Sequence, residues 1–160
     1  MIAFTDGSCR NNGREGSRGG FGVIFVNDDG TYHSCYQKFC DNTTNNKEEI
    51  KAILYVFLKY GKMRPAPVVY SDSAYCVNML NDWIFKWARN NWLKSDNKTP
   101  ENLDLVTAFY EYYLKGYQID LRKIKGHAGI EWNEIADKLA TGALTVDDVE
   151  RKYNGGNKVV

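Results

Sequence analysis

Residues 21–39 read FGVIFVNDDGTYHSCYQKF, and this stretch decides the fold because two strands and their connecting turn follow one another directly. Residues 21–26 are apolar and rich in β-branched side chains, and residues 31–39 are rich in Tyr, Cys and Phe, as is typical of strands. The segment NDDG at 27–30 has the chemistry of a hairpin turn. We therefore predict an antiparallel pair of strands here.

The segment before this hairpin predicts one more strand. Ile2, Phe4 and Asp6 alternate so that they share one face of an extended chain. A glycine-rich stretch over 7–22 follows, and we expect it to turn the chain back toward the hairpin. The first forty residues thus predict a three-stranded antiparallel meander.

Helices and strands alternate after the meander. Thr43 or Thr44 can cap a helix that ends near residue 60. Its apolar residues recur at the helical period, namely Ile50, Ile53, Leu54, Phe57 and Leu58. Two prolines then precede a fourth strand at 68–70, and a second helical stretch runs through residue 80.

The remaining segments complete an α/β pattern. They are an aromatic and basic insertion at 82–98, a helix opened by 99–101 and stopped by Gly116, a fifth strand at 118–124, a turn at 126–129 and a helix at 132–143. This order predicts a five-stranded mixed sheet, an antiparallel meander and then parallel strands, flanked by helices.

Length and composition are those of one folded domain. The chain has 160 residues, of which 43% are hydrophobic and 26% charged, and this excludes a disordered chain. It has no run of about 18 apolar residues and no basic, apolar leader, so we expect neither a membrane span nor a secretory signal. A net charge of +1 offers no attraction for a polyanion unless the charges are segregated.

The cysteine pattern argues against disulfides and a zinc site. The four cysteines form no CxxC pair, and only two histidines are available to join them in a metal site. We therefore expect reduced thiols and a cytoplasmic protein.

Four acidic residues stand where secondary structure changes. They are Asp6 at a strand end, Glu49 in the first helix, Asp72 at the end of the fourth strand and Asp137 in the last helix. Each one alone reads as a cap, a turn residue or a solvated charge, but strand ends at the open edge of an α/β sheet are common ligand sites. Converging carboxylates repel one another unless cations lie between them. Two divalent ions about 4 Å apart are a known arrangement for phosphodiester displacement.

The helical period chooses between two adjacent glutamates. On a helical wheel Glu49 borders the apolar face, whereas Glu48 points nearly opposite. Glu49 is therefore the candidate ligand, and we expect Glu48 to face solvent.

Five motifs in one order resemble type 1 ribonuclease H. They are DGSC (6–9), GGFG (19–22), TTNNKEE (43–49), YSDS (70–73) and GHAGIEWNEIADKLA (126–140). Their order and spacing match over roughly residues 1–143. The resemblance implies a ribonuclease H-like fold, with a catalytic domain over 1–145, a handle insertion at 82–98 and a peripheral tail at 146–160.

The resemblance also implies the chemistry. In that family the carboxylates that match Asp6, Glu49, Asp72 and Asp137 bind two Mg²⁺ ions, which Mn²⁺ can replace, beside the scissile phosphate of the RNA strand in an RNA–DNA hybrid. One ion activates the attacking water and the other stabilises the leaving 3′ oxygen. The implied products carry a 5′-phosphate and a 3′-hydroxyl. Four carboxylates offset the charge of two divalent ions, which gives the pattern a physical basis.

A histidine and a fifth acid complete the implied site. By itself His127, in the motif GHAG, reads as a turn histidine. The resemblance implies the family's mobile catalytic histidine, which transfers a proton or helps product and metal to leave. Glu131 resembles the family's glutamate near the second metal, which assists metal exchange.

Small polar residues are the implied substrate contacts, because short side chains suit 2′-hydroxyl recognition in a shallow minor groove. By resemblance Cys9, Asn12, Asn45 and Asn46 would line that groove, while Thr44 and Asn102 would hold a phosphate of the DNA strand. The loop after DGSC lacks the compact Asn-Pro-Gly form, so Asn11 remains an alternative to Asn12. Asn42 stands where some relatives have an arginine. An Asn-Asn pair after Thr-Thr is also explained by helix capping alone.

The insertion at 82–98 has two interpretations. Trp83, Trp87 and Trp92 are spaced by four and five residues, so they can pack a short helix onto the domain. By resemblance, Trp83 lies against the DNA backbone. Lys86 and its basic neighbours leave a local charge excess of +2, which resembles the basic handle of cellular enzymes and predicts salt-sensitive binding.

Three functions compete. The first is an endonuclease that removes RNA from RNA–DNA hybrids, acting as a monomer away from membranes. The second is a hybrid-binding module with weak catalysis, and the third is the nuclease domain of a reverse transcriptase or an integrase-like transferase. The full carboxylate set favours the enzyme over the binding module. The handle, the histidine loop and the start at Met1 favour a cellular hydrolase.

Overall fold

A computed structural model describes residues 1–12, 14–124 and 131–154. Along the chain the elements are β1 (Ile2–Arg10), β2 (Arg18–Val26), β3 (Tyr32–Asp41), α1 (Asn45–Tyr60), β4 (Val68–Ser71), α2 (Ala74–Asn78), the π-helical turn η1 (Met79–Trp83), α3 (Ile84–Arg89), α4 (Leu103–Leu114), β5 (Asp120–Lys123), α5 (Glu131–Thr141) and α6 (Val146–Tyr153). No helix in these ranges has the length and apolar character needed to cross a membrane.

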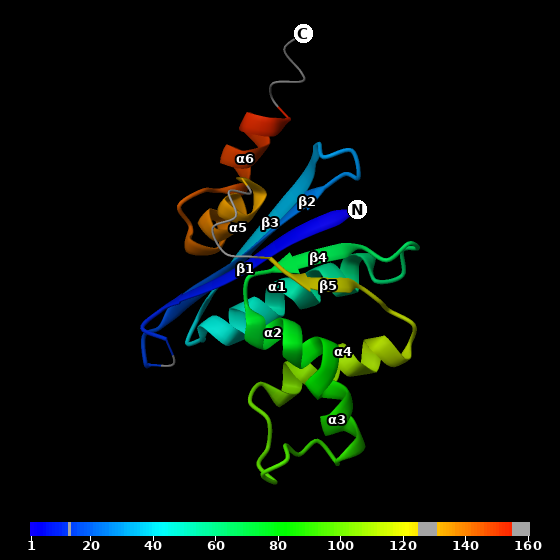
Figure 1. The fold of residues 1–160 in the computed structure, drawn as a ribbon. Coiled ribbons are helices and arrows are strands. Elements are labelled where there is room, and N and C mark those ends of the chain that lie inside the picture. Colours follow the sequence, from blue (N-terminus) through cyan, green and yellow to red (C-terminus); the bar gives the residue numbers. More distant parts are fainter. Residues whose placement is uncertain (13, 125–130, 155–160) are drawn as a thin grey trace.

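The strands form one mixed sheet in the order β3-β2-β1-β4-β5. β1 pairs antiparallel with β2, and β2 with β3, whereas β4 runs parallel to β1 and β5 runs parallel to β4. The helices α1 to α4 cover one face of the sheet, and α5 and α6 cover the other (Figure 1). The predicted α/β architecture, an antiparallel meander followed by parallel strands, is therefore confirmed.

Alternation along the strands builds a separate core on each face. In β2, Val23 and Phe25 point toward α1, while Ile24 and Val26 point toward α5. These four side chains are at most 2% exposed. Burial of each such side chain contributes about 1.5–3 kcal/mol relative to leaving it in water, so both helical layers are held to the central strands.

The glycine-rich stretch turns the chain over fewer residues than expected. β1 continues to Arg10 and β2 already begins at Arg18, so only residues 11–17 form the connection. The glycines in β2 serve packing instead of turning. A Cβ atom at Gly20 would lie 2.8 Å from the Ala140 carbonyl oxygen of α5 and would also collide with the Phe39 ring of β3.

The handle region packs against the domain through its tryptophans. Trp87 is only 9% exposed and belongs to the core, and Trp92 stands edge-on to Tyr110 of α4 with ring centroids 5.3 Å apart. The packing interpretation is therefore confirmed for these two residues. The helix expected from residue 99 begins later, at Leu103, because Asn102 adopts a left-handed backbone conformation with φ 58°.

Helix α6 is an element that the sequence pattern did not predict. Thr145 begins it with a capping box, in which its hydroxyl accepts a hydrogen bond from the Asp148 backbone N–H. Val149 of this helix is 2% exposed and packs in the α5-side core. Tyr153 stacks on Tyr32 of β3 and also contacts Trp132 at the start of α5. The domain boundary at 145 remains a prediction.

Candidate active site

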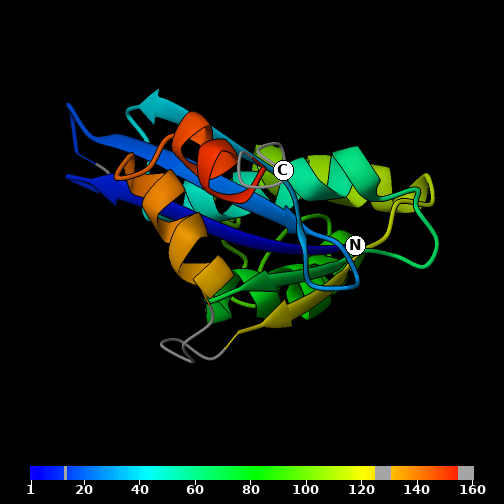
Figure 2. The ribbon, with the colours of Figure 1, turned by 90° about the horizontal axis from the view of Figure 1, so that it is seen from above.

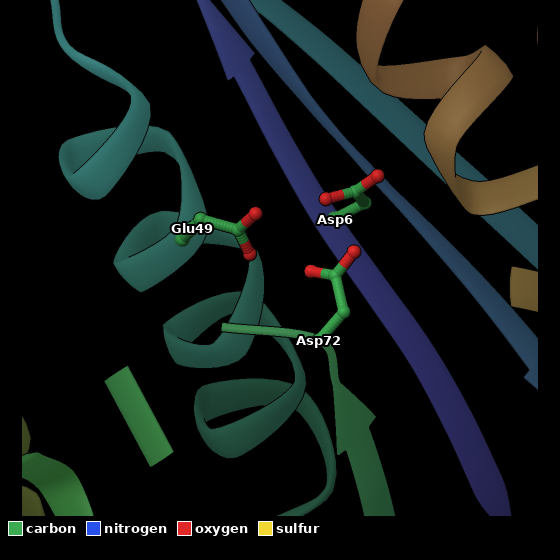
Figure 3. Close-up of side chains that lie close together, drawn as sticks. All are labelled: Asp6, Glu49 and Asp72. Carbon is green, nitrogen blue, oxygen red and sulfur yellow. The ribbon is translucent and has the colours of Figure 1, made fainter. Parts of the chain in front are cut away.

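Three carboxylates from three different elements meet at one edge of the sheet. Asp6 lies in β1, Glu49 in α1, and Asp72 directly after β4. Each offers an oxygen atom, and these three atoms lie within 4.8 Å of one another. Figure 3 shows the three side chains turned toward a common point. Carboxylate oxygens at this spacing form a donor set suited to a hard divalent cation.

A glycine lets α1 approach β1 closely enough for this meeting. A Cβ atom at Gly7 would collide with the backbone of Glu48 and with the backbone nitrogen of Glu49. The helix begins at Thr44, whose hydroxyl accepts a hydrogen bond from the Lys47 N–H at 3.1 Å. The cap and the missing side chain together hold Glu49 beside Asp6.

The parallel pairing of β1 and β4 brings the third acid to the same place. Phe4 of β1 pairs with Tyr70 of β4, so Asp6 and Asp72 both lie two residues beyond that pair. The carboxyl ends of parallel strands share one edge of a sheet, where ligands commonly bind. Ser73 then caps α2 through a 3.2 Å hydrogen bond from the Cys76 N–H, which turns the chain away from the edge.

Asp137 approaches from the opposite layer. It lies on α5, which crosses β1 and β2 (Figure 2). The close approach of this helix requires Gly22, where a Cβ atom would lie 2.6 Å from the Ala136 carbonyl oxygen. Asp137 is exposed, and its carboxylate is near enough to affect the ionisation of Asp6. The structure therefore brings the four predicted acids to one region, and three of them have an oxygen atom within 4.8 Å of the others.

Burial and neighbouring carboxylates raise the pKa values of Asp6 and Glu49. Burial, followed by the neighbouring Glu49, Asp72 and Asp137 carboxylates, raises the pKa of Asp6 far above its usual range. Burial also raises the pKa of Glu49. The Oε2 atom of Glu49 is buried and has no hydrogen-bond partner within the described residues. A bound cation would favour the charged forms of Asp6 and Glu49.

The expectation that Glu48 faces solvent is wrong. Glu48 is 1% exposed, accepts a 2.7 Å hydrogen bond from the Thr43 hydroxyl and forms a 2.8 Å ion pair with Lys51. The helical wheel describes only the faces of α1 itself. The side opposite the apolar stripe is covered here by Thr43 and by Gly19 of β2, which no helical period reveals.

The residues predicted to contact RNA gather beside the first turn of α1. The Asn12 side-chain oxygen accepts a 2.7 Å hydrogen bond from the Asn45 N–H, and this joins the β1–β2 connection to the helix. The Cys9 thiol donates to the Thr43 carbonyl oxygen at 3.3 Å. Asn46 is the next residue of the same helix. These polar groups therefore form one continuous surface, although their contact with RNA remains a prediction.

A second group of predicted contacts lies at the handle. Trp83 and Lys86 line a hollow together with Tyr75 and Glu101. The Trp83 ring stands edge-on to Tyr75 at 5.5 Å between centroids. Lys86 forms a 3.4 Å ion pair with Asp82, so part of its charge is already compensated. Asn102 is the residue after Glu101, which lines this hollow. Its contact with a DNA phosphate remains a prediction.

Two further predicted site residues are His127 and Glu131. His127 falls outside the described residues. The Glu131 carboxylate accepts hydrogen bonds from the Tyr153 hydroxyl at 2.6 Å and from Lys152 at 3.3 Å, both on α6. These contacts join the start of α5 to the end of α6. A role of Glu131 in metal exchange remains a prediction.

Sequence reasoning missed Ser17 and Thr43, which tie the substrate-facing segments together. Ser17 is 1% exposed, and its hydroxyl donates to the Thr43 carbonyl oxygen at 3.1 Å while accepting from the Thr43 N–H at 3.0 Å. The sequence pattern predicts only that Thr43 is an alternative helix cap to Thr44. Because the contact joins residues 26 positions apart, neither strand nor helix periodicity could reveal it.

Comparison with known proteins agrees with this geometry. The family model described as RNase H matches residues 1–145. A protein named Ribonuclease H from Caldanaerobacter subterraneus subsp. tengcongensis is 42% identical over 143 residues, which cover 86% of each chain. A Ribonuclease H from Clostridium botulinum is 34% identical over 90% of this chain and 95% of its own. A Ribonuclease HI from Haemophilus influenzae is 37% identical over 86% of this chain and 84% of its own.

Solved structures show the same architecture. LC9-RNase H1, described as a type 1 RNase H with the type 2 active-site motif, is 29% identical with a TM-score of 0.67, over 89% of this chain and 70% of its own. The PFV RNase H domain, 23% identical, superimposes with a TM-score of 0.76 over 88% of this chain and 92% of its own. LC11-RNase H1, solved in complex with an RNA/DNA hybrid, shares 19% identity with a TM-score of 0.64, over 92% and 97% of the two chains. By its family model, its relatives and its fold, this chain belongs to the RNase H family.

Proposed function

We propose that this chain is a metal-dependent endoribonuclease that hydrolyses the RNA strand of RNA–DNA hybrids and leaves 5′-phosphate and 3′-hydroxyl ends. The observation that carries the proposal is the meeting of Asp6, Glu49 and Asp72 at one sheet edge in a member of the RNase H family. A protein that only binds hybrids has no use for a repulsive acidic cluster of this kind.

The donor set fits divalent cations. Asp6, Glu49, Asp72 and Asp137 would hold two Mg²⁺ ions, which Mn²⁺ can replace. The Oε2 atom of Glu49 has no hydrogen-bond partner within the described residues, so it can serve as a metal ligand. When bound, the ions supply charge stabilisation to the phosphate and lower the pKa of a water molecule.

The protein itself contributes position and electrostatics. Gly7 and Gly22 set how closely α1 and α5 approach Asp6, so the spacing of the acids is built into the backbone. Around the first turn of α1, the Asn12–Asn45 pair presents side-chain amide groups suited to 2′-hydroxyl recognition. We propose that this surface selects the RNA strand and that the Trp83 hollow receives the DNA strand. His127 is proposed to move a proton during product release.

Cleavage of a labelled RNA–DNA hybrid tests the proposal. We expect Mg²⁺-dependent cleavage of the RNA strand, no cleavage of duplex DNA or duplex RNA, and products that a 5′-phosphate-dependent exonuclease degrades. Binding of the hybrid without cleavage would instead favour a binding module of the same fold.

Asp72→Asn is the first variant to measure, because Asp72 is the exposed member of the cluster. We expect loss of at least about a hundredfold in kcat, with folding and hybrid binding kept, since one charge of the metal-binding set is removed. Full activity of this variant would contradict the metal model. We further propose that the protein acts as a monomer in the cytoplasm, which light scattering and cell fractionation would check.

A further inference from the structure

Beneath the RNA-facing surface lies a small buried polar cluster, which we name the Thr43 corner and define as Cys9, Ser17, Thr43 and Glu48. Ser17, Thr43 and Glu48 are each at most 2% exposed. They come from the β1–β2 connection, the β3–α1 connection and the first turn of α1. Cys9 near the end of β1 completes the cluster.

Hydrogen bonds join every member of this corner to Thr43. The Thr43 hydroxyl donates to Glu48 Oε2 at 2.7 Å. Its carbonyl oxygen accepts from the Ser17 hydroxyl at 3.1 Å and from the Cys9 thiol at 3.3 Å. The Glu48 carboxylate is the only charged group among the four, so it is the strongest acceptor that holds Thr43 in place.

Burial of the Glu48 carboxylate costs hydration free energy, which its contacts in the protein must offset. Replacing a whole buried ion pair with apolar groups of similar volume is often neutral or stabilising, because the pair loses its hydration when it is buried. Lys51 compensates Glu48 only from a side chain that is itself 29% exposed, and Glu48 Oε1 has no hydrogen-bond partner within the described residues. We therefore expect the Glu48 carboxylate to fix the position of Thr43 and to add little to the free energy of unfolding.

The constraint acts on the segments that face the substrate. Thr43 immediately precedes Thr44, the cap of α1, and the Asn12–Asn45 hydrogen bond crosses the same gap at the surface. Gly19 of β2 packs against this corner so closely that a Cβ atom there would lie 2.6 Å from Thr43 Cγ2 and 3.2 Å from Glu48 Cγ. A shift of Thr43 would thus move Asn12, Thr44 and Asn45 relative to Glu49.

We propose that Glu48 is a positioning residue for hybrid binding. It holds Thr43 so that the RNA-facing groups of the β1–β2 connection, the β3–α1 connection and the first turn of α1 keep their positions relative to the acidic cluster. The inference rests on the proposed function. Glu48 touches neither substrate nor metal in this account, and its effect should be on KM and Kd more than on kcat.

The test uses one set of variants at the two ends of the bond. Glu48→Met removes the carboxylate, Thr43→Val removes the hydroxyl, and the double variant removes both ends of their hydrogen bond. Lys51, the ion-pair partner of Glu48, is 29% exposed and can turn its ammonium group to water. We expect each of the three to raise KM for the hybrid about tenfold with kcat little changed. The double variant should keep a melting temperature close to that of the wild type. Glu48→Gln keeps an acceptor for Thr43 and should restore KM to near the wild-type value.

The controls separate positioning from stability. Glu111→Met makes the same exchange at an exposed site on α4 and should change neither KM nor melting temperature. The effects of Thr43→Val and Glu48→Met should not add, because both break one bond. A folded double variant with unchanged KM would overturn the inference, as would fully additive single effects or a Glu48→Gln variant as impaired as Glu48→Met.

Hybrid binding keeps this test independent of cleavage. In the Asp72→Asn background, Kd for a fluorescent hybrid should rise about tenfold on Glu48→Met. If the wild-type chain cleaves no hybrid, the proposed function fails, and this Kd alone decides the inference. An unchanged Kd would then refute the positioning role.

Discussion

At the scale of single residues, the two adjacent glutamates show what a sequence pattern can and cannot tell. Periodicity correctly placed Glu49 beside the apolar face, and the structure turns it toward Asp6 and Asp72. The same pattern predicts that Glu48 faces solvent, whereas Glu48 is buried and accepts a hydrogen bond from Thr43. A helical wheel contains no information about which neighbouring segments cover the polar side. Long-range polar contacts therefore had to come from the structure.

The raised pKa of Asp6 leads to a prediction on stability in the absence of metal. The folded state keeps a proton that the unfolded chain releases near pH 4, so this group makes the free energy of unfolding fall as pH rises above 4. Asp6→Asn cannot ionise. We expect it to be more stable than the wild type by about 1–3 kcal/mol at pH 8 in EDTA, with the difference shrinking toward pH 4.

Urea unfolding of both proteins at several pH values, with and without Mg²⁺, measures this effect. Mg²⁺ should stabilise the wild type more than the variant, because it compensates a charge that Asn lacks. A variant less stable than the wild type at pH 8 in EDTA would show that Asp6 is not destabilised in the fold.

At the scale of elements, the order of strands and helices was readable from the sequence because each segment carries its own period and its own caps. The hairpin at 27–30 formed as predicted, with an Asn27 N–H to Thr31 carbonyl hydrogen bond of 2.8 Å. Element ends were less readable. The glycines of β2 resembled a turn because glycine is frequent both in turns and where another element packs closely, and only the position of α5 distinguishes the two.

Gly22 provides a prediction at this scale. A methyl group at this position would push α5 away from β2, since it would lie 2.6 Å from the Ala136 carbonyl oxygen. We expect Gly22→Ala to cost about 1–3 kcal/mol of stability and to raise the Mg²⁺ concentration needed for half-maximal cleavage, because Asp137 moves with the helix. Denaturant unfolding and a Mg²⁺ titration of activity check both parts. Unchanged values in both would contradict the packing argument.

The handle gives a second prediction for an element. Trp83 lies half-buried against Tyr75, next to the exposed Lys86. If the hollow around it receives the DNA strand, Trp83→Ala should raise KM severalfold with only a modest loss of stability. The matched exchange Trp92→Ala removes a ring that packs on Tyr110 and should mainly lower the melting temperature. A Trp83 variant that loses stability with unchanged KM would identify that ring as packing only.

At the scale of the whole molecule, a net charge of +1 does not describe the local electrostatic field that a polyanion would encounter. Three of the acids are gathered at one edge, where a bound cation would reverse the local field. The basic residues of the handle lie in another region (Figure 1). The segregation that composition left open is thus present, and the sum of charges conceals it.

This arrangement predicts two separate ionic dependences for hybrid binding. The slope of log Kd against log salt should be modest, below about 4, because the handle at 82–98 has a local charge excess of only +2. In the Asp72→Asn background, Mg²⁺ in excess over EDTA should tighten binding through the remaining Asp6, Glu49 and Asp137, even though it raises ionic strength. Fluorescence anisotropy over a range of NaCl and Mg²⁺ concentrations measures both. Binding that weakens equally with either salt would contradict the local role of the cation.

The aromatic contact between α5 and α6 has an optical consequence. Three of the four tryptophans, Trp83, Trp87 and Trp92, belong to the handle region, and Trp132 stands alone at the start of α5, with its ring centroid 4.9 Å from that of Tyr153. Replacing the three handle tryptophans with phenylalanine would leave a single tryptophan, next to the hydrogen bonds that join Glu131 to Lys152 and Tyr153 of α6. Its emission would report undocking of α6 during a titration, without any attached dye.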